Sequence, residues 1–394
     1  MRTSMNSRTR ISPRFRTPVA SRRLAVAAAG LVLACGHVVG VANAQVVPAE
    51  LPDGPPAWAT PVEQRNAAIA YFRAWMAHGD AGVAISEAMS ELDNGYEFPA
   101  GSPMDDLLIE HQDYVADLIA AAMIPQADWE IQYERGVYAM LPHLGRLRNS
   151  ARLLIADASR LARDGDVDGA ALRLAAVYGV ARHSRPDRVI ISSLVSTAIT
   201  ALANQQVEAL LARGDLTQTA RERLLDAVEQ FEQDDPFWSR KSLRAEGEMM
   251  TGWIRDRYTG TTAGADLLND MVEMGGSGEG FDDRLTNPLF YADGQALRAQ
   301  LRLMYAFYRD TDAIWDEADA QDRFTVMQQG IHAGMYGSLG KIMVPAMKRF
   351  HSSAQEGEAE LRNTIKLIRE APVVNETELS EIGSNQVGSN QIDT

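Results

Sequence analysis

The sequence from residue 151 to residue 181 reads ARLLIADASRLARDGDVDGAALRLAAVYGVA, and it contains two apolar runs joined by a short polar turn. Leu154 and Leu161 recur seven positions apart in the first run, and Leu174 and Val177 recur three apart in the second. Apolar residues at these spacings lie on one side of an α-helix. Because the turn is short, the two helices should run antiparallel. The stretch therefore predicts an α-helical hairpin.

The same helical pattern extends to both sides of the hairpin. A third helix is expected to begin near Asp187 and to end at Gly214, a residue suited to a helix C-cap. Asp215 or Thr217 can cap the N-terminus of a fourth helix, and Ser102 can cap an earlier one. Alternation of β-branched residues, which would predict strands, is rare. We therefore predict an all-α protein, either an antiparallel helical bundle or an irregular helical stack.

The first 44 residues have the features of a secretory signal peptide. The segment to Arg23 carries seven arginines and no acidic residue, and a run of apolar and small residues follows at 24–41. The run ends in Ala-Asn-Ala at 42–44, a pattern that signal peptidase cleaves. The mature chain should then begin at Gln45 and reside in the periplasm or the cell envelope.

Three alternatives remain for this leader. The apolar run approaches the roughly 18 residues of a membrane-spanning helix, so an uncleaved anchor would give the protein a transmembrane segment. Arg22 and Arg23 resemble a twin-arginine signal, which leaves the export route open. Cys35 lies in Val-Leu-Ala-Cys-Gly, which resembles a lipidation site. Since Cys35 is the only cysteine, cleavage after Ala44 would leave a mature chain without disulfides or thiol chemistry.

The charge of the chain restricts its partners. It contains 53 acidic and 38 basic residues, a formal net charge of −15. Nucleic-acid binding requires positive charge to replace counterions, so no nucleic-acid partner is expected. An anionic membrane surface is disfavoured for the same reason. The balance fits a soluble protein that attracts cations or basic partners.

Composition divides the rest of the chain into five segments. Residues 45–60 hold several prolines and predict an extended lead-in, and residues 61–258 predict a helical domain. Residues 259–293 predict a Gly-rich linker region and the best candidate for a hinge. Residues 294–372 predict C-terminal helices that pack on the same body. Residues 373–394 are polar and predict a disordered tail.

Four glycines near the C-terminus are spaced as on one face of a helix: Gly330, Gly334, Gly337 and Gly340. Glycine lowers helix stability by about 1 kcal/mol per position relative to alanine. The stripe therefore predicts either a close helix crossing or a segment that is not continuously helical.

The turn of the hairpin resembles the start of an EF-hand calcium loop. Asp164, Asp166 and Asp168 alternate before a glycine, so three carboxylates could converge on a cation. The match then fails, because Leu172 and Ala175 occupy positions nine and twelve, where oxygen ligands are needed. Two interpretations remain: a weakly bound Ca²⁺, or a helix-helix turn in which Asp166 or Asp168 caps the second helix. No other cofactor is predicted.

Two groups of carboxylates are the candidates for catalysis. Glu130 and Glu134 lie among aromatic residues in one segment, and Glu246 and Glu248 do so in another. Paired carboxylates near aromatic rings are typical of glycoside-cleaving sites. The alternative is that all four lie on solvated helix faces. No zinc-protease, serine-hydrolase or phosphate-loop motif is present.

Residues 141–211 resemble a known group of sequences. The stretch is marked by LLIADA at 153–158, RDGDVDGA at 163–170, VARH at 180–183 and IISSLV at 190–195. It is similar to uncharacterised exported helical proteins of planctomycete-type bacteria. The resemblance implies a helical fold and export, and it implies no activity, cofactor or catalytic residue. It also indicates that the Asp-rich turn is a feature of the hairpin rather than a calcium loop.

The sequence leaves catalysis open and favours a role without it. We expect an envelope interaction or scaffold protein that binds protein partners through its helical faces. The alternatives are a periplasmic hydrolase with a carboxylate-based site and a weakly calcium-responsive protein. A deep pocket that gathers two of the four glutamates would favour the hydrolase. A grooved apolar surface would favour the interaction protein.

Overall fold

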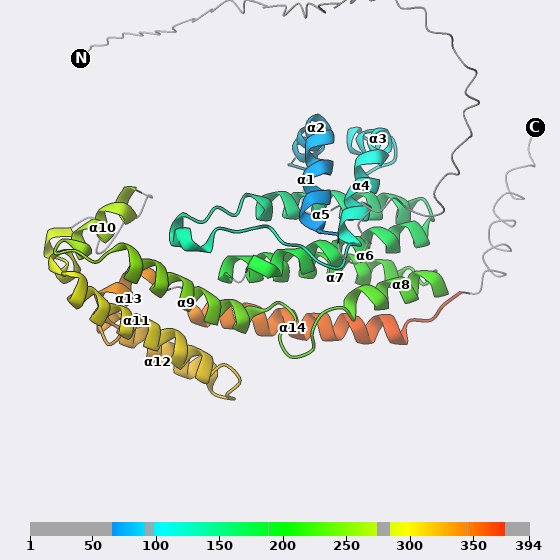
Figure 1. The fold of residues 1–394 in the computed structure, drawn as a ribbon. Helices are drawn as coiled ribbons and strands as arrows, with labels where there is room; N and C mark the ends of the chain where they lie inside the picture. Colours follow the sequence, from blue (N-terminus) through cyan, green and yellow to red (C-terminus); the bar gives the residue numbers. More distant parts are fainter. Residues whose placement is uncertain are drawn as a thin grey trace, which may run out of the picture. The chain divides into compact units, whose positions relative to one another are not determined.

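The structure, a computed structural model, describes residues 65–90, 96, 98–187, 189–273, 284–344 and 346–374. The predicted signal peptide and lead-in, and residues 375–394 of the predicted tail, lie outside this part. Within the described residues every regular element is a helix, so the all-α prediction is confirmed (Figure 1). None of the helices described is long and apolar enough to cross a membrane.

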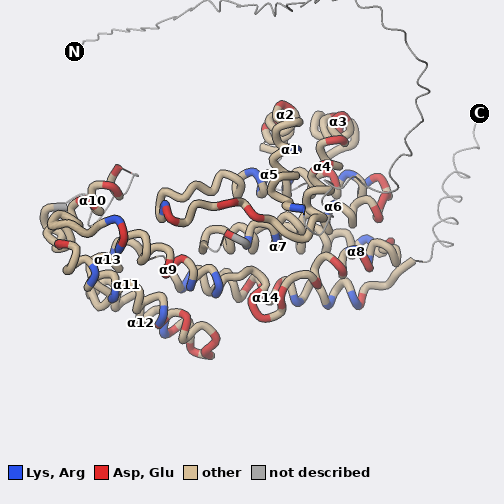
Figure 2. Tube along the Cα trace, viewed as in Figure 1, with Lys and Arg blue, Asp and Glu red and all other residues tan. Residues whose placement is uncertain are grey.

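The α-helices are α1 (Ala67–Ala77), α2 (Gly79–Ser90), α3 (Pro103–Glu110), α4 (Gln112–Ala122), α5 (Pro142–Arg163), α6 (Val167–Ser184), α7 (Ile190–Ala212), α8 (Gln218–Val228), α9 (Ser239–Arg257), α10 (Ala263–Glu273), α11 (Gly294–Ala313), α12 (Ala320–His332), α13 (Gly337–Met343) and α14 (Met347–Glu370). Short 3₁₀ turns are η2 (Tyr133–Tyr138), η3 (Arg185–Asp187), η4 (Arg284–Thr286) and η5 (Pro288–Tyr291). Acidic and basic positions are interspersed along these helices (Figure 2).

Local capping explains several helix ends that the sequence predicts. The Ser102 hydroxyl accepts a hydrogen bond from a backbone amide of α3, and the Thr217 hydroxyl does so for α8. Asp166 accepts from the Gly169 amide at 2.8 Å and caps α6. Gly214 has a φ of 77°, a conformation that favours glycine, and it follows α7. These side chains satisfy amides that have no partner within their own helix.

The first hydrophobic core surrounds α6. This helix packs against α5, α7 and α8, and residues around its whole circumference are buried. Tyr178 of α6 and Leu154 of α5 are completely buried, and Leu361 of α14 joins the same core. A helix that is buried all round needs neighbours on every side. The hairpin of α5 and α6 is thus the centre of this core (Figure 1).

A second hydrophobic core forms among α9 to α13. Trp253, Phe307 and Phe324 belong to it, together with Phe350 from the first turns of α14. Two helices contribute to both cores: α14 through Phe350 and Leu361, and α7 through Ile190 and other residues such as Ile199. Continuous helices therefore connect the two cores within one compact unit.

The described part of the predicted Gly-rich linker is folded. Residues 263–273 form α10, and the Gly264 amide donates to the Ala292 carbonyl at 2.9 Å. A Cβ atom on Gly264 would lie 1.8 Å from the Leu289 carbonyl oxygen. Glycine is required at this position because it allows two backbones to approach, rather than because the segment is a flexible linker. Residues 274–283 of the predicted linker lie outside the described part.

Breaks divide some of the predicted helices. The helix that Ser102 caps ends at His111, and the chain continues at once as α4. A second break separates α1 from α2, which begins at Gly79 directly after the C-cap residue His78. In the glycine stripe, Gly334 and Gly337 have φ values of 82° and 77° and separate α12 from α13. The stripe is therefore not continuously helical, which was one of its two interpretations.

Candidate ligand-binding groove

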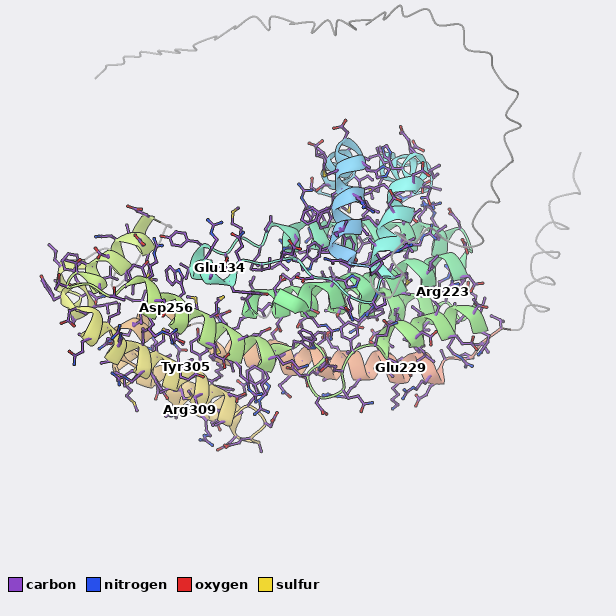
Figure 3. All side chains as sticks on the ribbon, in the orientation of Figure 1. Glu134, Arg223, Glu229, Asp256, Tyr305 and Arg309 are labelled. Atoms are coloured by element: carbon purple, nitrogen blue, oxygen red, sulfur yellow. The ribbon has the colours of Figure 1, made fainter. Side chains whose placement is uncertain are left out.

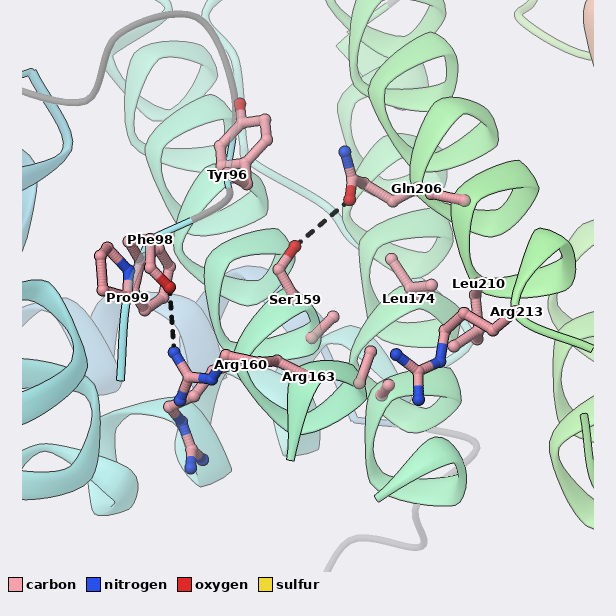
Figure 4. A pocket seen from close by; sticks show the side chains of 14 residues that line it. Tyr96, Phe98, Pro99, Ser159, Arg160, Arg163, Leu174, Gln206, Leu210 and Arg213 are labelled. Atoms are coloured by element: carbon pink, nitrogen blue, oxygen red, sulfur yellow. Dashed lines mark hydrogen bonds between the residues drawn. The ribbon is translucent and has the colours of Figure 1, made fainter. Parts of the chain in front are cut away.

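A cavity of about 620 Å³ opens between α5, α6 and α7 (Figure 4). We call it the arginine groove. Its lining comes from these three helices, from the residue after α7 and from the chain before α3: Tyr96, Phe98, Pro99, Ala158, Ser159, Arg160, Ala162, Arg163, Ala170, Leu174, Gln206, Ala209, Leu210 and Arg213.

Small residues create the space. Ala158 and Ala162 of α5, Ala170 of α6 and Ala209 of α7 line the groove with side chains of one carbon. Larger side chains at these positions would fill a cavity that close-packed protein interiors rarely leave open. The Ser159 hydroxyl donates to the side-chain carbonyl of Gln206 at 3.2 Å, so one hydrogen bond connects α5 to α7 at the groove (Figure 4).

Two arginines of the groove are held by carboxylates behind it. Arg160 donates from its Nε to Asp157 at 2.9 Å, and Asp157 is completely buried. Arg163 donates to Asp105 at 2.8 Å and to the Phe98 carbonyl at 3.1 Å. The hydrogen bond from Arg163 lowers the pKa of the Asp105 carboxyl, so this pair stays ionised. Buried partners fix both guanidinium groups in position before any ligand arrives.

The third arginine has a free donor. Arg213 donates from Nε and Nη2 to Asp215, at 3.3 Å and 2.8 Å. Within the described residues its Nη1 atom has no recorded hydrogen-bond partner, and about a third of the side chain is exposed. A guanidinium group carries five donors and binds carboxylates well. Arg213 is therefore the group best placed to bind an anionic ligand.

The predicted catalytic glutamates do not line the arginine groove. Glu130, Glu134 and Glu248 are exposed, and Glu134 projects from η2 (Figure 3). Glu246 is half-buried, and it accepts a hydrogen bond from the Ile190 amide at 2.8 Å. Burial raises the pKa of its carboxyl. None of the four lines the groove or the two other cavities found beside α12 and α14.

Glu246 has a clear structural role that the sequence does not reveal. Helix α7 begins after Val189, whose side chain cannot cap it. The carboxylate of Glu246, 56 residues further along the chain, instead accepts from the first amide of α7. A negative charge at a helix N-terminus is favourable, because the free amides there carry partial positive charge.

The three aspartates of the predicted calcium loop have separate partners. Asp164 pairs with Arg163, Asp166 caps α6, and Asp168 accepts a hydrogen bond from the Thr217 hydroxyl. In the part of the chain that the structure describes, no group of three or more acidic, histidine or cysteine side chains is arranged to hold a metal ion. The geometry agrees with the second interpretation of the turn, in which Asp166 caps the helix.

A buried histidine-aspartate pair lies outside the groove. His143 and Asp187 are 2.6 Å apart, and both side chains are almost completely buried. The ring of Trp129 stacks on His143 at 4.3 Å between centroids. Burial raises the pKa of Asp187, and the hydrogen bond from His143 opposes that rise. The residues are 44 positions apart, so no local pattern in the sequence could indicate the pair.

Comparison with known proteins assigns neither a family nor a function to this chain. No family model, no curated protein and no solved structure matches this chain. The chemistry of the groove itself is therefore the starting point for a functional proposal.

Proposed function

We propose that this protein is an exported interaction protein of the cell envelope that binds an acidic segment of a partner protein in the arginine groove. One observation carries the proposal. Three arginines and no carboxylate line the groove, although the whole chain has a net charge of −15. Each of these arginines is paired with an aspartate outside the lining, so the attraction for an anion comes from the donor that Arg213 leaves free inside the groove.

The groove offers separate contacts for each part of a peptide. Arg213 can donate to a carboxylate through its free Nη1 atom. Leu174 and Leu210 provide an apolar floor for a side chain, and Phe98 lies on the wall. The amide of Gln206 can bond to a peptide backbone. A volume of about 620 Å³ is typical of sites that bury a ligand of a few residues.

Binding fits these residues better than catalysis does. Hydrolysis needs a nucleophile or a water molecule beside a general base. Ser159 is the only hydroxyl of an aliphatic side chain in the lining, and it donates to Gln206 rather than to a base. The lining contains no histidine, aspartate or glutamate. The groove residues can therefore hold an anion but have no group of suitable pKa to take a proton from water.

Site-specific crosslinking tests the proposal. A photoreactive benzoylphenylalanine would replace Gln206 in the full chain, expressed in the envelope of its host. We expect protein adducts whose crosslinked peptides are acidic, and we expect Arg213→Gln to reduce them at least several-fold. The control carries the same photoreactive residue at Arg309, an exposed position of α11 (Figure 3). Adducts with lipids alone, or protein adducts equal at both positions, would rule out the proposal.

A further inference from the structure

The described part of the chain ends beside the residues that follow α7. After α14, Ala371 and Val373 pack against the first hydrophobic core. The Val374 amide then donates to the Leu216 carbonyl at 2.9 Å. Leu216 follows Arg213 by three residues, which span at most about 11 Å. Val374, the last residue that the structure describes, therefore lies near the loop that begins at Arg213.

The residues that follow complement the groove in charge and polarity. Positions 375–382 read NETELSEI, and no basic residue occurs between 375 and 394. Three glutamates lie in these eight residues, with a leucine and an isoleucine among them: Glu376, Glu378, Leu379, Glu381 and Ile382. A carboxylate matches the free donor of Arg213, and the two apolar side chains match the floor of alanine and leucine.

The tether is long enough to reach. Eight extended residues span about 26 Å, more than twice the distance that can separate Leu216 from Arg213. A segment that is joined to its site by a short tether has an effective concentration in the millimolar range. Even a segment with millimolar affinity would then occupy a nearby site for a large fraction of the time.

We infer that Glu376–Ile382 of this chain occupies the arginine groove and competes there with the acidic segment of a partner. This inference rests on the proposed function, since it names a second occupant of the same groove. The segment binds with a glutamate on Arg213 and an apolar side chain on the floor. A partner has to displace it, so the tail lowers the apparent affinity of the groove.

A competition experiment tests the inference in the full mature chain. The probe is a fluorescein-labelled peptide of residues 375–385, added in trans and followed by fluorescence anisotropy. We expect the variant Glu376→Gln, Glu378→Gln, Glu381→Gln to bind the probe about 2- to 10-fold more tightly than the unmodified chain, because its own tail no longer competes. Arg213→Gln added to this variant should abolish most of the binding.

A matched control separates competition from a general change in charge. The variant Glu130→Gln, Glu134→Gln, Glu248→Gln removes three carboxylates that are exposed and outside the groove. It should bind the probe as the unmodified chain does. An equal gain in both triple variants would overturn the inference, because the effect would then be a general electrostatic one.

The remaining outcomes distinguish the inference from the proposed function. If the probe binds the unmodified chain and the tail variant equally, and Arg213→Gln abolishes binding, the tail does not compete. The groove would still bind acidic segments, and only the inference would fail. If the probe binds neither protein, the groove does not accept acidic segments, and the proposed function fails together with the inference.

Discussion

Single polar residues acquire their roles from partners that are distant in sequence. His183 donates from Nε2 to the Ile124 carbonyl at 2.7 Å and accepts from the Tyr71 hydroxyl at 3.1 Å. Burial, together with the nearby positive charge of Arg182, lowers the pKa of His183 to about 3. The ring is therefore neutral at physiological pH, with both nitrogens occupied. Such a histidine joins three segments of the fold and is poorly suited to exchange protons.

The buried pair of His143 and Asp187 should contribute strongly to stability. His143→Leu leaves the Asp187 carboxylate almost completely buried without its partner. We expect the free energy of unfolding, measured by urea denaturation, to fall by about 3 kcal/mol. Adding Asp187→Asn should recover part of the loss, because a neutral amide costs less to bury than a carboxylate. A double variant less stable than the single one would contradict this account.

Glu358 should make stability depend on pH. Burial raises the pKa of its carboxyl to about 7, with smaller contributions from Asp235 and Asp316, while Arg362 opposes the rise. In the unfolded chain the carboxyl ionises near 4.5. Between these values the folded state binds a proton that the unfolded state has lost. The free energy of unfolding should therefore fall as the pH rises from about 4.5 to 7.

Glu358→Gln should remove this dependence. At pH 8 we expect the variant to be more stable than the unmodified chain by about 1 to 2 kcal/mol, a value reduced because the carboxyl is only partly buried and solvent stabilises its ionised form. At pH 4.5 the two proteins should be equally stable. Glu360→Gln, an exposed position on the same helix, is the control and should change little at either pH. Thermal melts at the two pH values provide the measurement. If Glu358→Gln increased stability equally at both pH values, the raised pKa of Glu358 would not be the cause.

At the scale of helices, glycines decide how closely neighbours approach. Gly179 of α6 faces α4, and a Cβ atom there would lie 2.3 Å from the Ala122 carbonyl oxygen. Gly145 of α5 has no neighbour within 4 Å of such an atom. The two positions have opposite consequences for the same substitution, although both glycines lie within helices.

Gly179→Ala should destabilise the protein, and Gly145→Ala should stabilise it. The first substitution forces α4 and α6 apart, which we expect to cost about 1 to 3 kcal/mol despite the better helix propensity of alanine. The second gains about 0.5 to 1 kcal/mol from propensity alone. Chemical denaturation of both variants gives the comparison. Stabilisation by Gly179→Ala would show that the two helices are not in close contact.

At the scale of the whole folded unit, the two hydrophobic cores should unfold together. Helix α14 places Phe350 in one core and Leu361 in the other, so neither core can lose this helix without exposing the other. Phe350→Ala and Leu361→Ala should each lower the same unfolding midpoint, with a loss of about 3 kcal/mol. Fluorescence and circular dichroism should report coincident transitions. A second transition, shifted by only one substitution, would indicate independent cores.

The predicted leader determines where the whole protein resides. If the leader is a cleaved signal peptide, the mature protein should begin at Gln45 and fractionate with the periplasm or the envelope. N-terminal sequencing of the protein from its host measures this directly. An N-terminus at Cys35 would indicate lipidation, and an N-terminus at Met1 would indicate that the leader is retained.

The candidate site could be predicted only in part. The four glutamates were grouped by their proximity in sequence, but three of them are exposed and Glu246 caps α7. The groove, in contrast, depends on Arg163 and Arg213, which are fifty residues apart and have no shared motif. In the sequence, the groove is reflected in the alanine-rich composition of three adjacent helices. The same composition is expected of an ordinary helical core, so it could not identify a groove.

The sequence by itself determined the all-α class, the central hairpin and the cap at Ser102, and it limited two further caps to Asp166 or Asp168 and to Asp215 or Thr217. These depend on apolar spacing and on hydrogen bonds within a few residues, and such local properties are readable from the chain. Only the tertiary structure decided which carboxylates are paired, which glycines are tightly packed and where space remains between helices. Those features depend on distances between residues far apart in the chain, and those distances follow from how whole helices pack.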